Sequence, residues 1–176
     1  SKDDRRYLHG LAILEAKRWL RPLDRGDSSE ATDPDAPSSQ MLRYLSRADV
    51  VSDRAVKWGM LTNGAVWRLY WQDARSRSEE FFEIDLACAL GIPGVQHTLD
   101  DIAPAHALRL FYLFFQRSAF LPQPWDSAQR SFHAYALNEA RLYEEKVSQD
   151  LGARVFGEVF PQLADALTRW DLQAQT

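Results

Sequence analysis

The sequence predicts an α/β fold in which helices flank a mixed sheet and a helical carboxy-terminal region follows. Residues 11–17 begin apolar on both faces, as a buried strand does. Asn63-Gly64 separates two runs rich in Val, Trp, Leu and Tyr, which predicts a hairpin over 56–62 and 65–71. From residue 104 onward, apolar side chains recur at helical spacing. We therefore expect an α/β core over 1–100 and a helical region over 101–176 that packs on it.

The strand over 11–17 ends in charge. Side chains alternate along a strand, so Ile13, Glu15 and Lys17 share one face while Leu14 and the flanking alanines share the other. Because both faces begin apolar, we expect this strand at the centre of the sheet, covered on both sides. Charges there are costly unless they are paired, hydrated or bound to a metal. Glu15 and Lys17 are therefore candidate site residues.

A loop and a short helix follow this strand. Residues 24–39 contain no large apolar side chain and are rich in Asp, Ser and Pro, which predicts a mobile surface loop. Met41 and Leu45 then begin an apolar stripe at helical spacing, with serines before it available as N-caps. On this predicted helix Gln40 and Tyr44 stand four residues apart, so they share a face.

The remaining elements follow from turn and capping signals. Asn63-Gly64 predicts a type I′ turn, which needs positive φ at both central residues. A short strand is expected near 80–84, with Asp85 capping a short helix. Pro104 fits the first turn of a buried helix. Two apolar stripes, over 136–151 and 155–167, predict amphipathic helices interrupted near Pro161.

Composition narrows the class of protein. The chain is 45% hydrophobic and 12% aromatic, which suits a substantial core, and it has no apolar run of the ~20 residues that a membrane helix needs. With no signal-peptide pattern, a cytoplasmic location is expected. The lone Cys88 excludes an internal disulfide. Residues 1–77 carry 14 Lys and Arg against 11 acids and residues 78–176 carry 7 against 14, so a phosphate partner is expected on the first half.

The Glu-x-Lys pattern has a specific chemical use. A carboxylate can hold Mg²⁺, and a lysine two residues on can orient a water and offset charge on a phosphate. The alternative for Glu15 and Lys17 is a structural salt bridge at the end of a strand. Gln40 has the alternative of a surface amide, and Tyr44 that of a core ring with a wet hydroxyl.

Five segments in order resemble a known family. The Glu-x-Lys strand followed by a Gln-x-x-x-Tyr helix is similar to the PD-(D/E)xK nuclease domain of type I restriction motor subunits. More narrowly, the chain resembles the amino-terminal region of type IIG fused restriction enzymes, in which an endonuclease domain precedes a helical connector and an adenine-specific DNA methyltransferase. The resemblance covers roughly residues 10–170. Its segments are "AILEAKRWLRPLD", "SSQMLRYL", "WGMLTNGAVWRLY", "FFEIDLACAL" and "LRLFYLFFQRSAF".

This resemblance implies a restriction-endonuclease-like sheet with a helical connector to a methyltransferase domain. It implies Mg²⁺-dependent hydrolysis of duplex DNA, with Mn²⁺ as a substitute. Glu15 would be a metal ligand and Lys17 the catalytic lysine, while Gln40 and Tyr44 would help to position DNA or a catalytic group. The implied partners are duplex DNA and the methyltransferase and target-recognition domains of the same polypeptide, with no membrane.

One element of the family pattern is missing from its usual place. The superfamily requires an aspartate on the strand before Glu-x-Lys, and the candidates are Asp4, opposite Glu15 in a hairpin through His9-Gly10, or a residue before Ser1. In the second case this chain alone should not cut DNA efficiently. The alternative function is a catalytically inactive, nuclease-like DNA-binding or domain-organising module of a DNA methyltransferase.

Arginines and tryptophans supply further candidates for DNA contact. Arg18, Arg21 and Arg25 follow Lys17 closely and suit phosphate contacts, with solvated surface as the alternative. Four tryptophans have side chains able to stack on bases, although sheet packing is the commoner role of aromatic residues in strands. They are Trp19, Trp58, Trp67 and Trp71.

Overall fold

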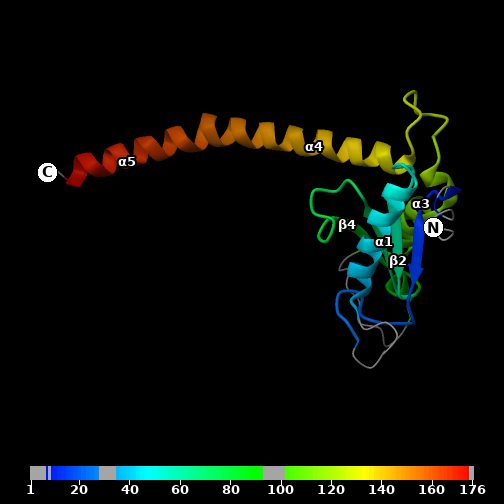
Figure 1. Cartoon of the computed structure of the whole chain (residues 1–176). Helices are drawn as coiled ribbons and strands as arrows, with labels where there is room; N and C mark the ends of the chain where they lie inside the picture. Colours follow the sequence, from blue (N-terminus) through cyan, green and yellow to red (C-terminus); the bar gives the residue numbers. More distant parts are fainter. Residues whose placement is uncertain (1–6, 8, 28–34, 93–101, 175–176) are drawn as a thin grey trace. The chain divides into compact units, whose positions relative to one another are not determined.

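The computed structural model describes residues 7, 9–27, 35–92 and 102–174. Its helices and strands appear in Figure 1, and they fall into two compact units, one up to Pro122 and one from Gln123. The first unit contains β1 (Ile13–Ala16), α1 (Pro37–Val51), β2 (Trp58–Thr62), β3 (Val66–Trp71), β4 (Phe81–Asp85), α2 (Leu86–Ala89), α3 (Pro104–Phe115) and the 3₁₀ helix η2 (Arg117–Phe120). The second contains α4 (Phe132–Arg154), the π-helical turn η3 (Val155–Val159) and α5 (Phe160–Ala174).

The four strands form one mixed sheet in the order β1-β2-β3-β4. β1 runs parallel to β2, whereas β2, β3 and β4 are antiparallel neighbours. The prediction of a mixed α/β fold is confirmed. The prediction of a central Glu-x-Lys strand is wrong, because β1 is an edge strand among the described residues. Its second face is open to solvent, and Leu14 on that face is 54% exposed.

Helices cover the two faces of the sheet. The first face carries Leu61 and Tyr70, which pack with Met41 and Leu45 of α1 in one apolar cluster. On the other face Trp67 meets the α3 rings of Phe111 and Phe115 edge to face, at centroid distances of 5.2 and 5.6 Å. Alternation along the strands separates the two clusters. The predicted packing role of Trp67 in the sheet is therefore confirmed.

The start of α1 differs from the prediction. The helix begins at Pro37, inside the predicted loop over 24–39, and its N-cap is Ala36 without a side-chain hydrogen bond. The serines lie in the first helical turn and do not cap it. Pro37 explains the early start, since its fixed φ suits the first helical position and its missing N–H costs nothing there. The Ser38 N–H donates to the Leu23 carbonyl at 2.8 Å, which anchors this end beside the sheet.

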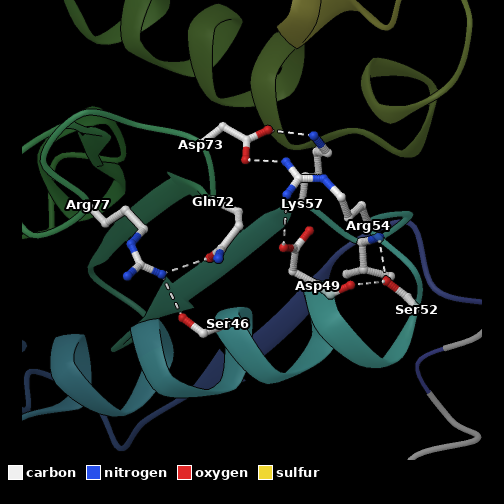
Figure 2. Close-up of polar contacts among 9 residues, drawn as sticks. Ser46, Asp49, Ser52, Arg54, Lys57, Gln72, Asp73 and Arg77 are labelled. Carbon is white, nitrogen blue, oxygen red and sulfur yellow. Dashed lines mark hydrogen bonds and ion pairs between the residues drawn. The ribbon is translucent and has the colours of Figure 1, made fainter.

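The other end of α1 is held by ion pairs (Figure 2). After the helix, Asp53 and Arg54 both adopt positive φ, of 51° and 65°. The chain then returns so that Arg54 and Lys57 both bind the Asp73 carboxylate, at 2.9 and 2.5 Å. These contacts tie the segment between α1 and β2 to the end of β3.

Trp58 and Trp71 are paired residues of β2 and β3, and their rings stack on each other. Both tryptophans therefore pack in the sheet, as predicted.

The connection between β2 and β3 is a hairpin, but the predicted type I′ turn is wrong. Only Gly64 has a positive φ, of 85°. The Asn63 side chain instead accepts hydrogen bonds from the N–H groups of Ala65 and Val66, at 3.1 and 2.8 Å. Its amide also donates to the carbonyl of Arg21 at 2.9 Å. Asn63 therefore fixes both the turn and the segment that follows β1, a tertiary role that adds to its turn propensity.

A buried arginine joins the first residues of the predicted loop to the sheet. Arg68 of β3 binds the Asp24 carboxylate through both terminal nitrogens, at 2.5 and 2.7 Å, and pairs with Glu83 of β4. The hydrogen bond from Arg68 lowers the pKa of Asp24 below its usual value. Burial alone would lower the pKa of Arg68, but its hydrogen bonds to the two carboxylates raise it overall. Asp24 is thus held in place, although the composition of its segment predicts mobility.

The second unit is mostly one continuous helical run. Ser131 caps α4 by accepting from the Ala134 N–H at 3.2 Å. The α-helical pattern is interrupted next to Pro161, as predicted, but the chain stays helical there through the π-helical turn η3. A proline lacks the N–H of the regular helical bond and crowds the preceding turn, and a wider turn accommodates both effects.

Three other local predictions are confirmed. Asp85 caps α2 by accepting from the Cys88 N–H at 2.8 Å, and Pro104 begins α3. The prediction that this helix is buried is wrong, because only Ala107 is buried in it and Tyr112 is 68% exposed. The predicted strand near 80–84 is β4. The division into compact units falls after Pro122 instead of residue 100, because α3 packs on β4 and α2 within the first unit. Of the helices that the structure describes, none combines the length and the apolar character needed to cross a bilayer.

We predict that Gly64→Ala destabilises the fold more than Gly91→Ala does. Both glycines have positive φ, which costs an alanine about 1–2 kcal/mol. An added Cβ at Gly64 would lie 2.6 Å from the Trp19 ring, whereas one at Gly91 meets nothing within 4 Å. Urea unfolding of both variants measures the difference. Equal losses would show that the Trp19 ring moves away without cost.

We also predict that Asp24→Asn flattens the pH dependence of stability. The pKa of Asp24 is depressed in the folded state, so its ion pair stabilises the fold above the usual carboxyl pKa and is lost as pH falls through the folded value. Because this side chain is partly exposed, we expect less than about 1 kcal/mol. Urea unfolding between about pH 6 and about pH 3 should show the wild-type advantage shrinking. An advantage that is constant with pH would contradict the assignment.

Candidate functional site

Three of the four predicted site residues meet at one point. Lys17 Nζ lies 2.8 Å from Glu15 Oε1, and it also donates a hydrogen bond to the side-chain oxygen of Gln40, 23 residues away. The Lys17 side chain is only 7% exposed, while that of Glu15 is 26% exposed. The lysine therefore bridges the end of the first strand and the first turn of α1.

The local structure explains why these residues meet. Lys17 continues the pairing of β1 with β2, since its N–H donates to the Thr62 carbonyl at 2.8 Å. Glu15 and Lys17 then point to the same face, which is the face that α1 covers. Met41 is fully buried against this face, and Gln40 precedes it in the helix. The buried anchor at Met41 thus brings the Gln40 amide over the end of β1.

Tyr44 joins the site through a surface cleft. The cleft has a volume of about 410 Å³ and is open to solvent. Glu15 and Tyr44 both line it, one from the strand and one from the helix, together with Tyr7, Ile13, Leu14 and Met41. Gln40 therefore belongs to the site through its hydrogen bond with Lys17, and Tyr44 through the cleft that it lines with Glu15.

This arrangement holds a positive charge beside an accessible carboxylate. A buried ammonium is stable only when its charge is compensated and its protons are bonded, and Glu15 and Gln40 do both. The cleft admits a ligand to the Glu15 side of the pair. An anionic ligand there would lie beside the carboxylate that Lys17 pairs with, and the nearly buried ammonium would offset part of the added negative charge. The geometry suits stabilisation of a phosphate or a similar anion.

The described residues supply one carboxylate to a metal site in this cleft. Glu15 is a suitable oxygen ligand for Mg²⁺, a cation that is usually held by one or two carboxylates together with waters and phosphate oxygens. Across the described part of the chain, no group of three or more His, Cys, Asp and Glu side chains is placed to hold a metal. Asp4, the other candidate ligand, lies outside the described residues. The expected turn at His9-Gly10 lies within them, and there the Gly10 N–H donates to the Tyr7 carbonyl at 3.4 Å.

One of the three arginines that the sequence offers for phosphate contact is buried. Arg21 is buried and donates to the Asp35 carbonyl at 3.1 Å, so the prediction that it binds phosphate is wrong for this fold. Arg18 is exposed and forms an ion pair with Asp27 at 2.5 Å, and Arg25 is exposed. Position in the chain could not separate these three residues, because burial depends on the segments that cover them.

Sequence reasoning did not find Arg68, which lies on the same face as the site. Glu15 pairs with Leu61, Leu61 with Arg68, and Arg68 with Glu83, so the four form one row across the sheet. A charged residue within the otherwise apolar strand 66–71 was the available signal. Arg68 binds two carboxylates in this row, and it therefore does not compete with Lys17 for Glu15.

Comparison with known proteins adds no assignment to this geometry. No family model matches the chain, and no curated protein or solved structure is significantly similar to it. The site must therefore be interpreted from its own chemistry.

We predict that Lys17→Met costs about 1 kcal/mol or less, below the about 3–5 kcal/mol that removal of one partner of a fully buried ion pair costs, because the Glu15 side chain is 26% exposed. Water from the cleft can hydrate the Glu15 carboxylate that remains. Urea unfolding tests this, with Lys57→Met as the control for loss of a paired lysine at the opposite end of the parallel strands. A loss above about 3 kcal/mol would identify Lys17 as a structural residue.

Proposed function

We propose that this chain is the Mg²⁺-dependent endonuclease module of a restriction-modification enzyme, with a restriction-endonuclease-like fold and duplex DNA as its substrate. The observation that supports this most directly is the Lys17 ammonium held between Glu15 and Gln40 beside an open cleft. Three of the four residues implied by the family resemblance meet at Lys17, and the fourth, Tyr44, lines the cleft together with Glu15.

The proposed reaction is hydrolysis of a phosphodiester. Water adds to phosphorus, one ester P–O bond breaks, and the products are a phosphate monoester end and a hydroxyl end. Lys17 would stabilise the charge that builds on the phosphoryl oxygens, and Gln40 would keep its ammonium in position. Glu15 would accept a hydrogen bond from the attacking water or hold the ion. When bound, Mg²⁺ would polarise the phosphate and lower the pKa of the water.

The second metal-binding carboxylate and the domains that recognise the DNA sequence would lie outside the described residues. The second carboxylate would be Asp4 or a residue before Ser1, as the resemblance implies. Mn²⁺ would substitute for Mg²⁺. Sequence recognition would come from the target-recognition and methyltransferase domains of the same cytoplasmic polypeptide, with residues 101–176 as the connector that reaches them.

One observation favours a second function. Among the described residues Glu15 is the sole acidic side chain that lines the cleft, and it is already paired with Lys17. A nuclease-like module that binds DNA or organises domains without cutting would need no second carboxylate in the cleft. The two functions differ in whether the cleft turns over a phosphodiester.

Plasmid cleavage by the full-length protein tests the proposal. With Mg²⁺ or Mn²⁺, we expect Lys17→Met and Glu15→Gln each to lose at least ~100-fold in rate, the loss typical of removing a preorganised electrostatic group. Gln40→Leu should lose about tenfold, since it acts by positioning Lys17. Lys57→Met is the matched control, because it also removes a paired lysine, and Figure 2 shows it bound to Asp73.

The outcomes separate the two functions. Cleavage that depends on Lys17 and Glu15 but not on Lys57 supports the nuclease. Cleavage that is unchanged in the Lys17 and Glu15 variants would exclude this site as the catalytic centre. Duplex binding without cleavage in any divalent cation would favour the DNA-binding module.

A further inference from the structure

A strained and exposed apolar turn follows directly after Lys17. Trp19 and Leu20 are 49% and 43% exposed. Leu20 has a φ of 59°, in the left-handed region that a bulky residue rarely occupies. The positive φ disfavours leucine at this position, where glycine or asparagine would fit at little cost. Folding alone therefore does not account for the residue.

The turn is held rigidly in this conformation. The Leu20 N–H donates to the Asn63 carbonyl at 3.1 Å, and the Asn63 side chain donates to the Arg21 carbonyl at 2.9 Å. The Trp19 ring lies directly over Gly64, close enough to exclude even a methyl group there. The hairpin between β2 and β3 thus supports both residues from beneath and leaves their outer surfaces open to solvent.

Its position relates the turn to the proposed site. Leu20 is three residues beyond Lys17, so their Cα atoms are at most ~11 Å apart. Successive base pairs of a duplex are separated by about 3.4 Å along its axis, so this distance covers only a few base pairs. A duplex with a phosphate at Lys17 would therefore have the turn within the span of a few base pairs.

We propose that Trp19 and Leu20 form an apolar contact with the sugar edges and bases of the duplex beside the cleaved phosphate. This inference rests on the proposed function and adds to it the surface that positions the DNA. Apolar side chains inserted at the edge of a groove unstack base steps and bend the duplex. A rigidly supported side chain can do this because it does not yield when the duplex pushes against it. The strain at Leu20 is then the cost of holding an apolar tip toward the DNA.

Substitutions at Leu20 should have opposite effects on stability, through relief of strain, and on affinity for DNA, through loss of the apolar contact. Leu20→Gly and Leu20→Asn both relieve the unfavourable φ, so the melting temperature should stay equal or rise. Affinity for a duplex oligonucleotide, measured by fluorescence anisotropy with Ca²⁺ in place of Mg²⁺, should fall about tenfold because apolar contact with the groove is lost. Val50→Ala is the control, since Val50 is an exposed apolar residue at the opposite end of α1 from Gln40.

Each outcome has a definite meaning when the same full-length proteins are also assayed for cleavage. Weaker binding by both Leu20 variants, with unchanged binding by Val50→Ala, supports the contact. Wild-type binding by the Leu20 variants overturns it, and the nuclease proposal stands if Lys17→Met still abolishes cleavage. Weaker binding by the Leu20 variants together with full cleavage by Lys17→Met would keep the DNA contact and remove the hydrolytic assignment. A wild-type protein that binds no duplex would overturn both.

Discussion

The close packing of α1 on β2 at Gly59 is the contact on which the site depends. An added Cβ at Gly59 would lie 2.7 Å from the Met41 sulfur, so the helix sits closer to the sheet than a side chain there would allow. Gly59 pairs with Ile13 of β1, and the helix therefore also lies over the first strand. This approach places the residue before Met41, Gln40, within reach of Lys17. Without it, the acid and the lysine on β1 would lack their partner from the helix.

Charged side chains on this face of the sheet belong to two groups of different character. Arg68 is bound by Asp24 and Glu83 and stacks on the Phe81 ring at 4.4 Å from its centroid. The charge of Arg68 is thus compensated by two carboxylates, and the bond to Asp24 joins the segment after β1 to the sheet. The pair of Lys17 and Glu15 differs, because it borders an open cleft that can admit a ligand. The first group joins segments of the fold, and the second lies at the candidate site.

The errors of sequence interpretation share a physical origin. The strand with Glu15 was expected at the centre of the sheet because both of its faces begin apolar, yet Leu14 faces solvent. An apolar pattern reports what a strand could bury, and the neighbouring elements decide what it does bury. Similarly, Asn63-Gly64 predicts a hairpin through its backbone preference, but the Asn63 side chain accepts from the N–H groups of the turn itself and also donates to the distant Arg21 carbonyl.

By itself the sequence determined the elements and the nature of the candidate chemistry. Local rules suffice for this, since alternation, helical spacing, the Asp85 cap and Pro104 each act within a few residues. It also placed Glu15 and Lys17 on one face. Only the tertiary structure decided that Gln40 bonds to Lys17, that Arg21 is buried and that the turn at Leu20 is strained and exposed. These features depend on contacts between segments far apart in the chain, and no local pattern encodes such contacts.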